Sequence, residues 1–185
     1  MARIAFINDK LGLTDGVSLE VDKWRAVFEA MGHEVWYIAG NDRHGIRTIP
    51  ELALKHPRTQ RLQRNVSGSR RDYRDREEEL ADLDAVSTAI EARLLDLVRG
   101  GRVDLLIPHN LLSLGHHLPA LVALAAVLVK TGIPTISHAH EFWFEDHLAP
   151  PAEDEAQAIL GRLAPPPLPW VRHVVLNRPA QAELQ

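Results

Sequence analysis

Six of the ten histidines in the chain lie in two short segments. They are His109, His116, His117, His138, His140 and His147. In an extended segment, His138 and His140 point to one side and Glu141 points to the other. Two imidazoles and a carboxylate can bind a metal ion, neutral imidazoles can hydrogen-bond a polar ligand, and two buried histidines can also be purely structural. The spacing alone leaves these three uses open.

Aromatic residues directly follow the second histidine segment. Phe142, Trp143 and Phe144 come immediately after Glu141. An aromatic ring beside hydrogen-bonding histidines can pack against one face of a sugar or of another ring. Trp143 is the candidate for that contact, and Phe142 or Phe144 is expected to belong to the core.

The loop after the first apolar run contains a second candidate site. Asp15, Gly16 and Val17 lie just before a predicted helix, and the N-terminus of a helix favours a phosphate group. Neither the dinucleotide pattern G-x-G-x-x-G nor the phosphate-binding pattern G-x-x-x-x-G-K-[ST] occurs in the chain, which removes the usual sequence support for those two chemistries. An ordinary turn with Asp15 as the helix cap explains the same residues.

Alternating strands and helices are predicted around these segments. Short β-prone runs occur at residues 4–7, 35–39, 103–107, 134–137 and 171–176, and helical patterns occur at residues 17–31, 79–97, 118–130 and 153–163. This alternation predicts an α/β fold: a Rossmann-like, doubly wound parallel sheet with helices on both faces. Ligands bind to such sheets beyond the carboxyl ends of the strands. The histidines and the first loop are predicted at those ends.

Two segments interrupt the alternation. Residues 43–78 form an irregular excursion that is rich in arginine, and residues 149–170 form a proline-rich connection. The arginines are Arg58, Arg61, Arg64, Arg70, Arg71, Arg74 and Arg76. They are expected either to form a solvated surface or to make a mobile basic loop beside a phosphate-bearing ligand.

Composition limits the class of protein. The chain has 185 residues, a formal net charge of -4, and no cysteine. This length suits one Rossmann-like domain over residues 1–185. The acidic balance argues against a nucleic-acid binder and does not indicate contact with a membrane. The start of the chain lacks the features of a signal peptide, and the longest apolar run, residues 118–129, is shorter than the roughly 18 residues that a membrane span needs. We therefore expect a cytoplasmic protein.

Several short motifs, in the same order, resemble the N-terminal domain of GT-B glycosyltransferases, most closely the GT4 (group 1) retaining family. The matching residues are 4–7 (IAFI), 15–17 (DGV), 30–35 (AMGHEV), 108–110 (PHN), 133–143 (IPTISHAHEFW) and 173–177 (HVVLN). The resemblance covers essentially the whole chain. Each motif is loose alone, and the order and spacing of the motifs carry the inference.

The resemblance implies an acceptor-binding domain that also contacts a nucleotide-sugar donor. By that resemblance, His140 contacts the transferred sugar and is catalytic together with Glu141. The substrate-binding residues would be Asp15, Gly16, Val17, His109, Asn110, His138 and Trp143. The donor is a co-substrate, no metal cofactor is expected, and most of the donor site belongs to a C-terminal domain that does not follow residue 177 here. We therefore expect the chain to be inactive alone.

Two departures from the family pattern concern the site itself. The usual Gly-Gly of the first loop is Asp15-Gly16, and the usual Asp after the histidine is Glu141. They affect substrate geometry more than the class of enzyme. Two rival functions remain open: a small metal-dependent hydrolase that uses His138, His140 and Glu141, and a non-catalytic Rossmann-like binding module.

Overall fold

The fold was obtained as a computed structural model, which describes residues 1–66, 72–145 and 154–183. These residues form a six-stranded sheet in which every strand pairing is parallel, with the order β3-β2-β1-β4-β5-β6. The strands are β1 (Arg3–Asn8), β2 (Glu34–Ala39), β3 (Ile46–Thr48), β4 (Leu105–Pro108), β5 (Thr135–Ala139) and β6 (Val171–Val175). The predicted α/β fold with a doubly wound parallel sheet is confirmed.

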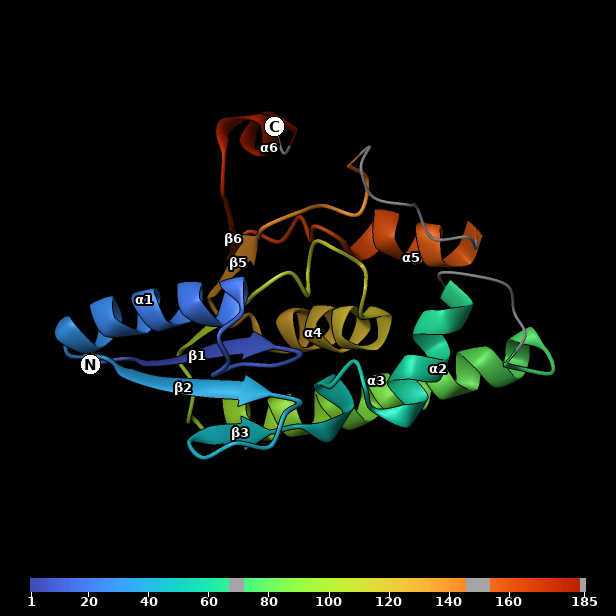
Figure 1. Cartoon of the computed structure of the whole chain (residues 1–185), viewed down its shortest axis with the longest axis horizontal. Coiled ribbons are helices and arrows are strands. Elements are labelled where there is room, and N and C mark those ends of the chain that lie inside the picture. Colours follow the sequence, from blue (N-terminus) through green and yellow to red (C-terminus); the bar gives the residue numbers. More distant parts are fainter. Residues whose placement is uncertain (67–71, 146–153, 184–185) are drawn as a thin grey trace.

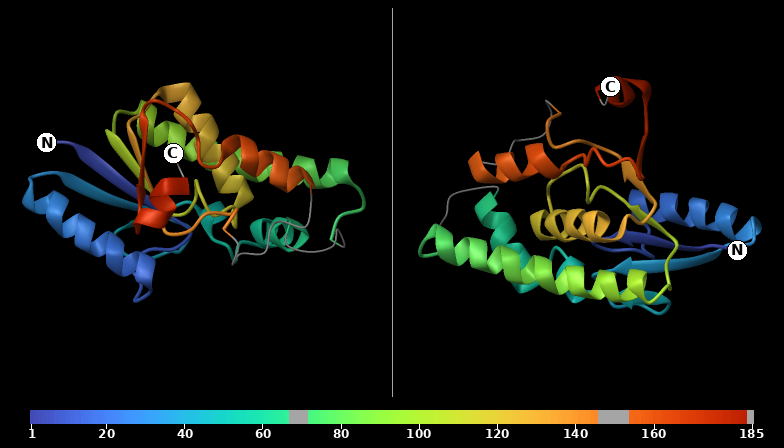
Figure 2. Two further views of the ribbon diagram at one scale, coloured as in Figure 1. Left: turned by 90° about the horizontal axis from the view of Figure 1, so that it is seen from above. Right: turned by 180° about the vertical axis from the view of Figure 1, so that it is seen from behind.

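Helices cover both faces of the sheet. They are α1 (Gly16–Ala30), α2 (Pro57–Val66), α3 (Arg76–Arg99), α4 (Leu118–Thr131), α5 (Asp154–Leu163) and α6 (Arg178–Glu183), with a short 3-10 helix η1 (Pro50–Leu52). Figure 1 shows α1 running beside β1 and β2, and the turned view in Figure 2 shows α1 on one side of the sheet and α3 and α4 on the other. Within the described residues, no helix is both long and apolar enough to cross a membrane.

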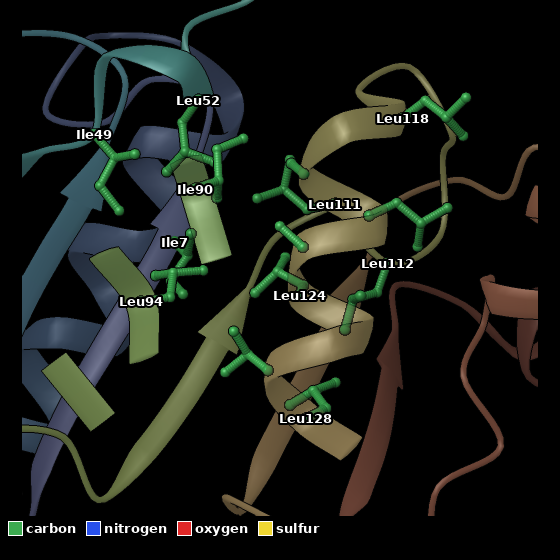
Figure 3. Packing of buried hydrophobic residues seen from close by; sticks show 14 of the residues in the cluster. Ile7, Ile49, Leu52, Ile90, Leu94, Leu111, Leu112, Leu118, Leu124 and Leu128 are labelled. Atoms are coloured by element: carbon green, nitrogen blue, oxygen red, sulfur yellow. The ribbon is translucent and has the colours of Figure 1, made fainter. Parts of the chain in front are cut away.

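The core lies in two layers because successive side chains of a strand point to opposite faces. In β1, Ala5 and Ile7 belong to a large cluster with side chains of α3 and α4, whereas Ile4 and Phe6 belong to a smaller cluster under α1. Figure 3 shows part of the large cluster, in which Leu124 of α4 is among the labelled residues. The apolar face of each helix therefore fixes its position on the sheet.

The arginine-rich segment is more regular than its sequence predicts. Residues 43–78 contain β3, η1 and α2, and α3 begins at Arg76, three residues before the predicted start. The arginines in its described part neutralise neighbouring acids. Arg58 pairs with Asp82, and Arg61 pairs with Glu78 at 3.1 Å. Two of the predicted basic residues, 70 and 71, lie outside the described residues. The described part of the segment is thus folded and ion-paired beside α3.

The order of the strands creates a switch point between β1 and β4. From β1 the chain proceeds to β2 and β3 on one side, and β4, β5 and β6 follow on the other side. The connections that leave the carboxyl ends of β1 and β4 therefore turn in opposite directions, and ligands bind at such a point in sheets of this kind. The first loop and the segments around His109 and His138 meet at this edge.

Candidate functional site

Three histidines meet at the carboxyl ends of β4 and β5. His109 directly follows β4, His138 lies in β5, and His140 directly follows β5. His109 and His138 form a parallel β-bridge. The ring centroid of His138 lies 4.6 Å from the ring centroid of His109 and 4.7 Å from that of His140. One nitrogen of each ring lies within 4.8 Å of the others. We call these residues the histidine cluster.

Four of the six ring nitrogens in the cluster are buried and lack hydrogen-bond partners among the described residues. His109 is 0% exposed and His138 is 2% exposed, while His140 is half-buried. Within the described part of the chain, both nitrogens of His109, Nδ1 of His138 and Nε2 of His140 are buried atoms without a hydrogen bond. Native structures seldom leave several such atoms unsatisfied in one place. These nitrogens are therefore available to hydrogen-bond or coordinate a ligand.

Burial keeps the cluster neutral. It lowers the pKa of His109 to about 3 and the pKa of His138 to about 4, and the neighbouring imidazoles lower both further. Burial also lowers the pKa of His140, against the opposing effects of two carboxylates, Glu20 and Glu141. Each ring thus carries one N–H donor and one nitrogen acceptor near neutral pH.

Helix α1 supplies an aromatic wall and a carboxylate beside the cluster. The Trp24 ring stacks on His138 with a centroid distance of 4.9 Å, and Phe6 of β1 lies 5.8 Å from His109. The indole nitrogen of Trp24 donates to Glu20 at 3.0 Å, which places that carboxylate one helical turn away. Glu20 and Trp24 were not among the predicted site residues. Their i, i+4 spacing on the helix after the first loop is the signal that could have found them.

Asn110 holds the two histidine segments together. Its side-chain oxygen accepts a hydrogen bond from the backbone N–H of His140 at 2.8 Å, and its own backbone N–H donates to the carbonyl of His138 at 3.0 Å. Asn110 has a positive φ of 58°, a conformation that asparagine adopts more readily than most residues. Asn110 therefore links the ends of β4 and β5, and we call its two hydrogen bonds the Asn110 clamp.

The first loop is fixed from two sides. Asp15 caps α1 by accepting from the backbone N–H of Ser18 at 3.2 Å and from its hydroxyl at 3.0 Å. At the other side, the side-chain amide of Asn41 makes two hydrogen bonds of 2.9 Å with the backbone of Leu11. Gly16 opens the helix, and a Cβ added to it would meet no atom within 4 Å. Val17 packs in the small cluster under α1.

The remaining predicted residues lie apart from the cluster or take part in other contacts. The indole of Trp143 packs against the large core cluster and donates to the carbonyl of Ala164 at 3.0 Å. Glu141 is half-buried and raises the pKa of His116 against the lowering effect of burial. The third residue of the first histidine segment, His117, is structural. Its Nδ1 accepts from the backbone N–H of Ala120, and its Nε2 contacts the carbonyls of Glu51 and Leu52. His147 lies outside the described residues.

Comparison with known proteins identifies two similar curated sequences. The chain is 36% identical over 184 residues to the mannosylglucosylglycerate synthase of Thermotoga maritima, covering 99% of this chain and 42% of that protein. It is 31% identical over 189 residues to the mannosylglucosylglycerate synthase of Petrotoga mobilis, covering 98% of this chain and 41% of that protein. The chain thus spans about two fifths of the length of these relatives. No family's sequence profile and no solved structure matches it.

Proposed function

We propose that this chain is the acceptor-binding part of a retaining glycosyltransferase that forms mannosylglucosylglycerate or a closely related glycoside. The observation that carries the proposal is the identity of 36% and 31%, over nearly the whole chain, to two proteins that share the name mannosylglucosylglycerate synthase. The name of that product places a mannosyl group on glucosylglycerate. The acceptor would then be glucosylglycerate, and the donor a nucleotide that carries mannose.

The histidine cluster supports this assignment chemically. A sugar presents several hydroxyl groups, each of which can donate and accept a hydrogen bond. The four buried ring nitrogens without partners can form hydrogen bonds with such groups. The rings are neutral because burial lowers their pKa values, so each ring offers both a donor and an acceptor. Preorganised polar groups in a water-poor site stabilise the charge that develops during transfer.

The reaction moves a sugar between two oxygens. The bond from the anomeric carbon to the phosphate oxygen of the donor breaks, a bond to an acceptor hydroxyl oxygen forms, and the hydroxyl proton leaves with the nucleotide. Retention means that the new bond has the configuration of the old one. In this scheme His140 contacts the transferred sugar, and Glu141 acts beside it as the second catalytic residue.

Gly16 and the start of α1 are assigned to the donor phosphates. The space around Gly16 is open in the structure, and the first N–H groups of a helix attract anions. Asp15 occupies the cap itself, so a phosphate would approach from the side of Gly16 and Val17. His109, His138 and Asn110 form the wall behind the sugar, with Asn110 fixing the backbone of His140. Trp143 is assigned to the acceptor side.

The decisive experiment is a nuclear magnetic resonance titration of the 15N-labelled chain with glucosylglycerate. We expect chemical-shift changes at His109, His138 and His140, and weaker binding in His140→Ala. The matched control is His44→Ala, because His44 is an exposed residue. Shift changes elsewhere, or none at millimolar acceptor, would refute the assignment of the acceptor site.

Transfer is measured separately. With a nucleotide mannose donor and glucosylglycerate, the isolated chain is expected to give no product by mass spectrometry, because it spans about two fifths of its relatives. Product formed by the chain alone would contradict the proposed need for the remaining part. Any product whose new linkage is inverted relative to the donor would contradict retention.

A further inference from the structure

We propose that His109, His138 and His140 form a binding site for a divalent transition metal ion of the Zn²⁺ class, with one coordination position left open. This site goes beyond the proposed transferase function and does not depend on it, and a bound ion would compete with sugar hydroxyls for the same ring nitrogens. Two of its features lead to the assignment: the positions of the ring nitrogens and the lack of hydrogen-bond partners for four of them.

The nitrogens are close enough to share one ion. One nitrogen of each ring lies within 4.8 Å of the other two. An ion at the centre of a triangle with sides of that length lies about 2.8 Å from each corner, whereas a Zn–N bond is about 2.0–2.1 Å. Ring movements of less than about 1 Å therefore bring the three nitrogens into bonding distance. The three residues come from two adjacent strand ends that the Asn110 clamp joins, so the rings share a rigid base.

The nitrogens are also in the right chemical state. A metal ion needs a neutral imidazole with a free lone pair, and imidazole suits zinc, copper, nickel and cobalt. Four of the six ring nitrogens in the cluster are buried without any hydrogen-bond partner among the described residues. Each of the three rings thus has at least one nitrogen that is free to take a ligand.

The surroundings of the cluster leave one side of it accessible. The carboxylate of Glu20 is paired with Lys23 and accepts from the indole nitrogen of Trp24, with contacts of 3.0 Å, so its charge is already balanced. His140 is the half-buried member of the cluster, so the open position of the metal faces its side. A three-histidine site of this kind leaves a fourth position for water or for a polar ligand.

The test uses Co²⁺ and Zn²⁺ as the probes, with no sugar present. Titration of the wild-type chain with Co²⁺ is expected to reach one ion per chain and to give the intense visible absorption of tetrahedral cobalt, which Zn²⁺ then displaces. His138→Ala and His140→Ala are expected to weaken Co²⁺ binding at least about tenfold, because each removes a ligand and loss of even an outer-shell partner costs about 10–100-fold. The exposed residue His44 provides the control, because His44→Ala should change nothing.

A second measurement needs no variant and remains informative if a variant fails to fold. Long-range 1H–15N spectra of the wild-type chain should show that Zn²⁺ shifts the ring signals of His109, His138 and His140 first among the ten histidines. Absence of stoichiometric binding, the weak spectrum of octahedral cobalt, or first shifts at other histidines would each overturn the proposal. A chain that binds Zn²⁺ but not glucosylglycerate would keep the metal site and refute the acceptor site, and the reverse result would do the opposite.

Discussion

Replacement of Gly16 by alanine tests whether this glycine is needed for the stability of α1 or for the approach of a phosphate to the start of the helix. In the structure, Gly16 is the first helical residue and a Cβ there would meet no atom within 4 Å. Alanine in a compatible helical position reduces the entropy of the unfolded chain, and such replacements stabilise by about 0.4–1 kcal/mol. Gly16→Ala is therefore expected to be more stable than wild type. For a domain of this size, that gain corresponds to a rise in Tm of about 1–4 °C.

The ligand affinity should change in the opposite direction. If a phosphate approaches the backbone N–H groups beside Gly16, a methyl group on this residue lies in its path. Loss of one hydrogen bond to a charged group costs about 1.5 kcal/mol, which is about tenfold in affinity. We expect this loss in a 15N titration with a nucleoside diphosphate, read from the backbone amides of residues 16–18. The free energy of unfolding comes from urea titration of the same samples.

Gly40 provides the matched control. A Cβ on Gly40 would lie 2.6 Å from the backbone carbon of Leu52 and closer still to the backbone nitrogen of Ala53. Because backbone cannot move aside as a side chain does, Gly40→Ala is expected to destabilise by about 3 kcal/mol, the upper end of the usual cost of overpacking. A drop in stability for Gly16→Ala would contradict the conclusion that a Cβ fits at this position without a clash. An unchanged affinity for the diphosphate would contradict the placement of the donor phosphates beside Gly16.

Three further predictions concern the cluster and its supports. Asn110→Ala should lower the free energy of unfolding, measured in urea, by about 1–2 kcal/mol, because the backbone N–H of His140 loses its partner. Asn110→Gly should lower it less, because glycine adopts the positive φ freely. A larger loss for glycine than for alanine would exclude backbone conformation as a contributor. Stability should fall as the pH drops from about 6.5 to 5, because burial lowers the pKa of His109 to about 3 and the pKa values of His116, His117 and His138 to about 4, so that these rings take up protons only on unfolding. Each ring contributes at most about 1.4 kcal/mol per pH unit. The double variant H109Q/H138Q should keep only the part of the slope that comes from the other buried histidines, and a slope equal to that of the wild type would contradict a contribution from His109 and His138. Asp15→Ala should cost about 1 kcal/mol through the lost cap of α1, and Asp15→Asn, which retains an accepting oxygen, should restore most of it.

Sequence patterns predicted the larger elements because each has a repeating apolar signal. The four predicted helices correspond to α1, α3, α4 and α5, and the five predicted strands correspond to β1, β2, β4, β5 and β6. Two elements lack such a signal. β3 has three residues, too few to show alternation, and α2 is polar except for Leu62 and Val66. Both are held by contacts outside the element itself: β3 pairs with β2, with Ile46 opposite Tyr37, and α2 packs against α3 and α4.

The candidate site could be predicted only in part. Alternation along an extended segment placed His138 and His140 on one side, and the structure brings their rings together. The third member, His109, joins them through the pairing of β4 with β5. Strand order is not contained in any local pattern, so the three-histidine arrangement was not predicted. The wall formed by Trp24 was missed because its helical spacing also fits an ordinary core residue, a role that it shares.

The hydrogen bonds of His117 determine where its ring proton resides. Nδ1 accepts from the backbone N–H of Ala120, so this nitrogen carries no hydrogen, and the proton must sit on Nε2, where it is shared with the carbonyls of Leu52 and Glu51. The ring is therefore held in a single tautomer, and its 15N signals should stay constant near neutral pH while a sugar or a metal ion binds the histidine cluster. His117 thus provides an internal spectroscopic reference within the same molecule.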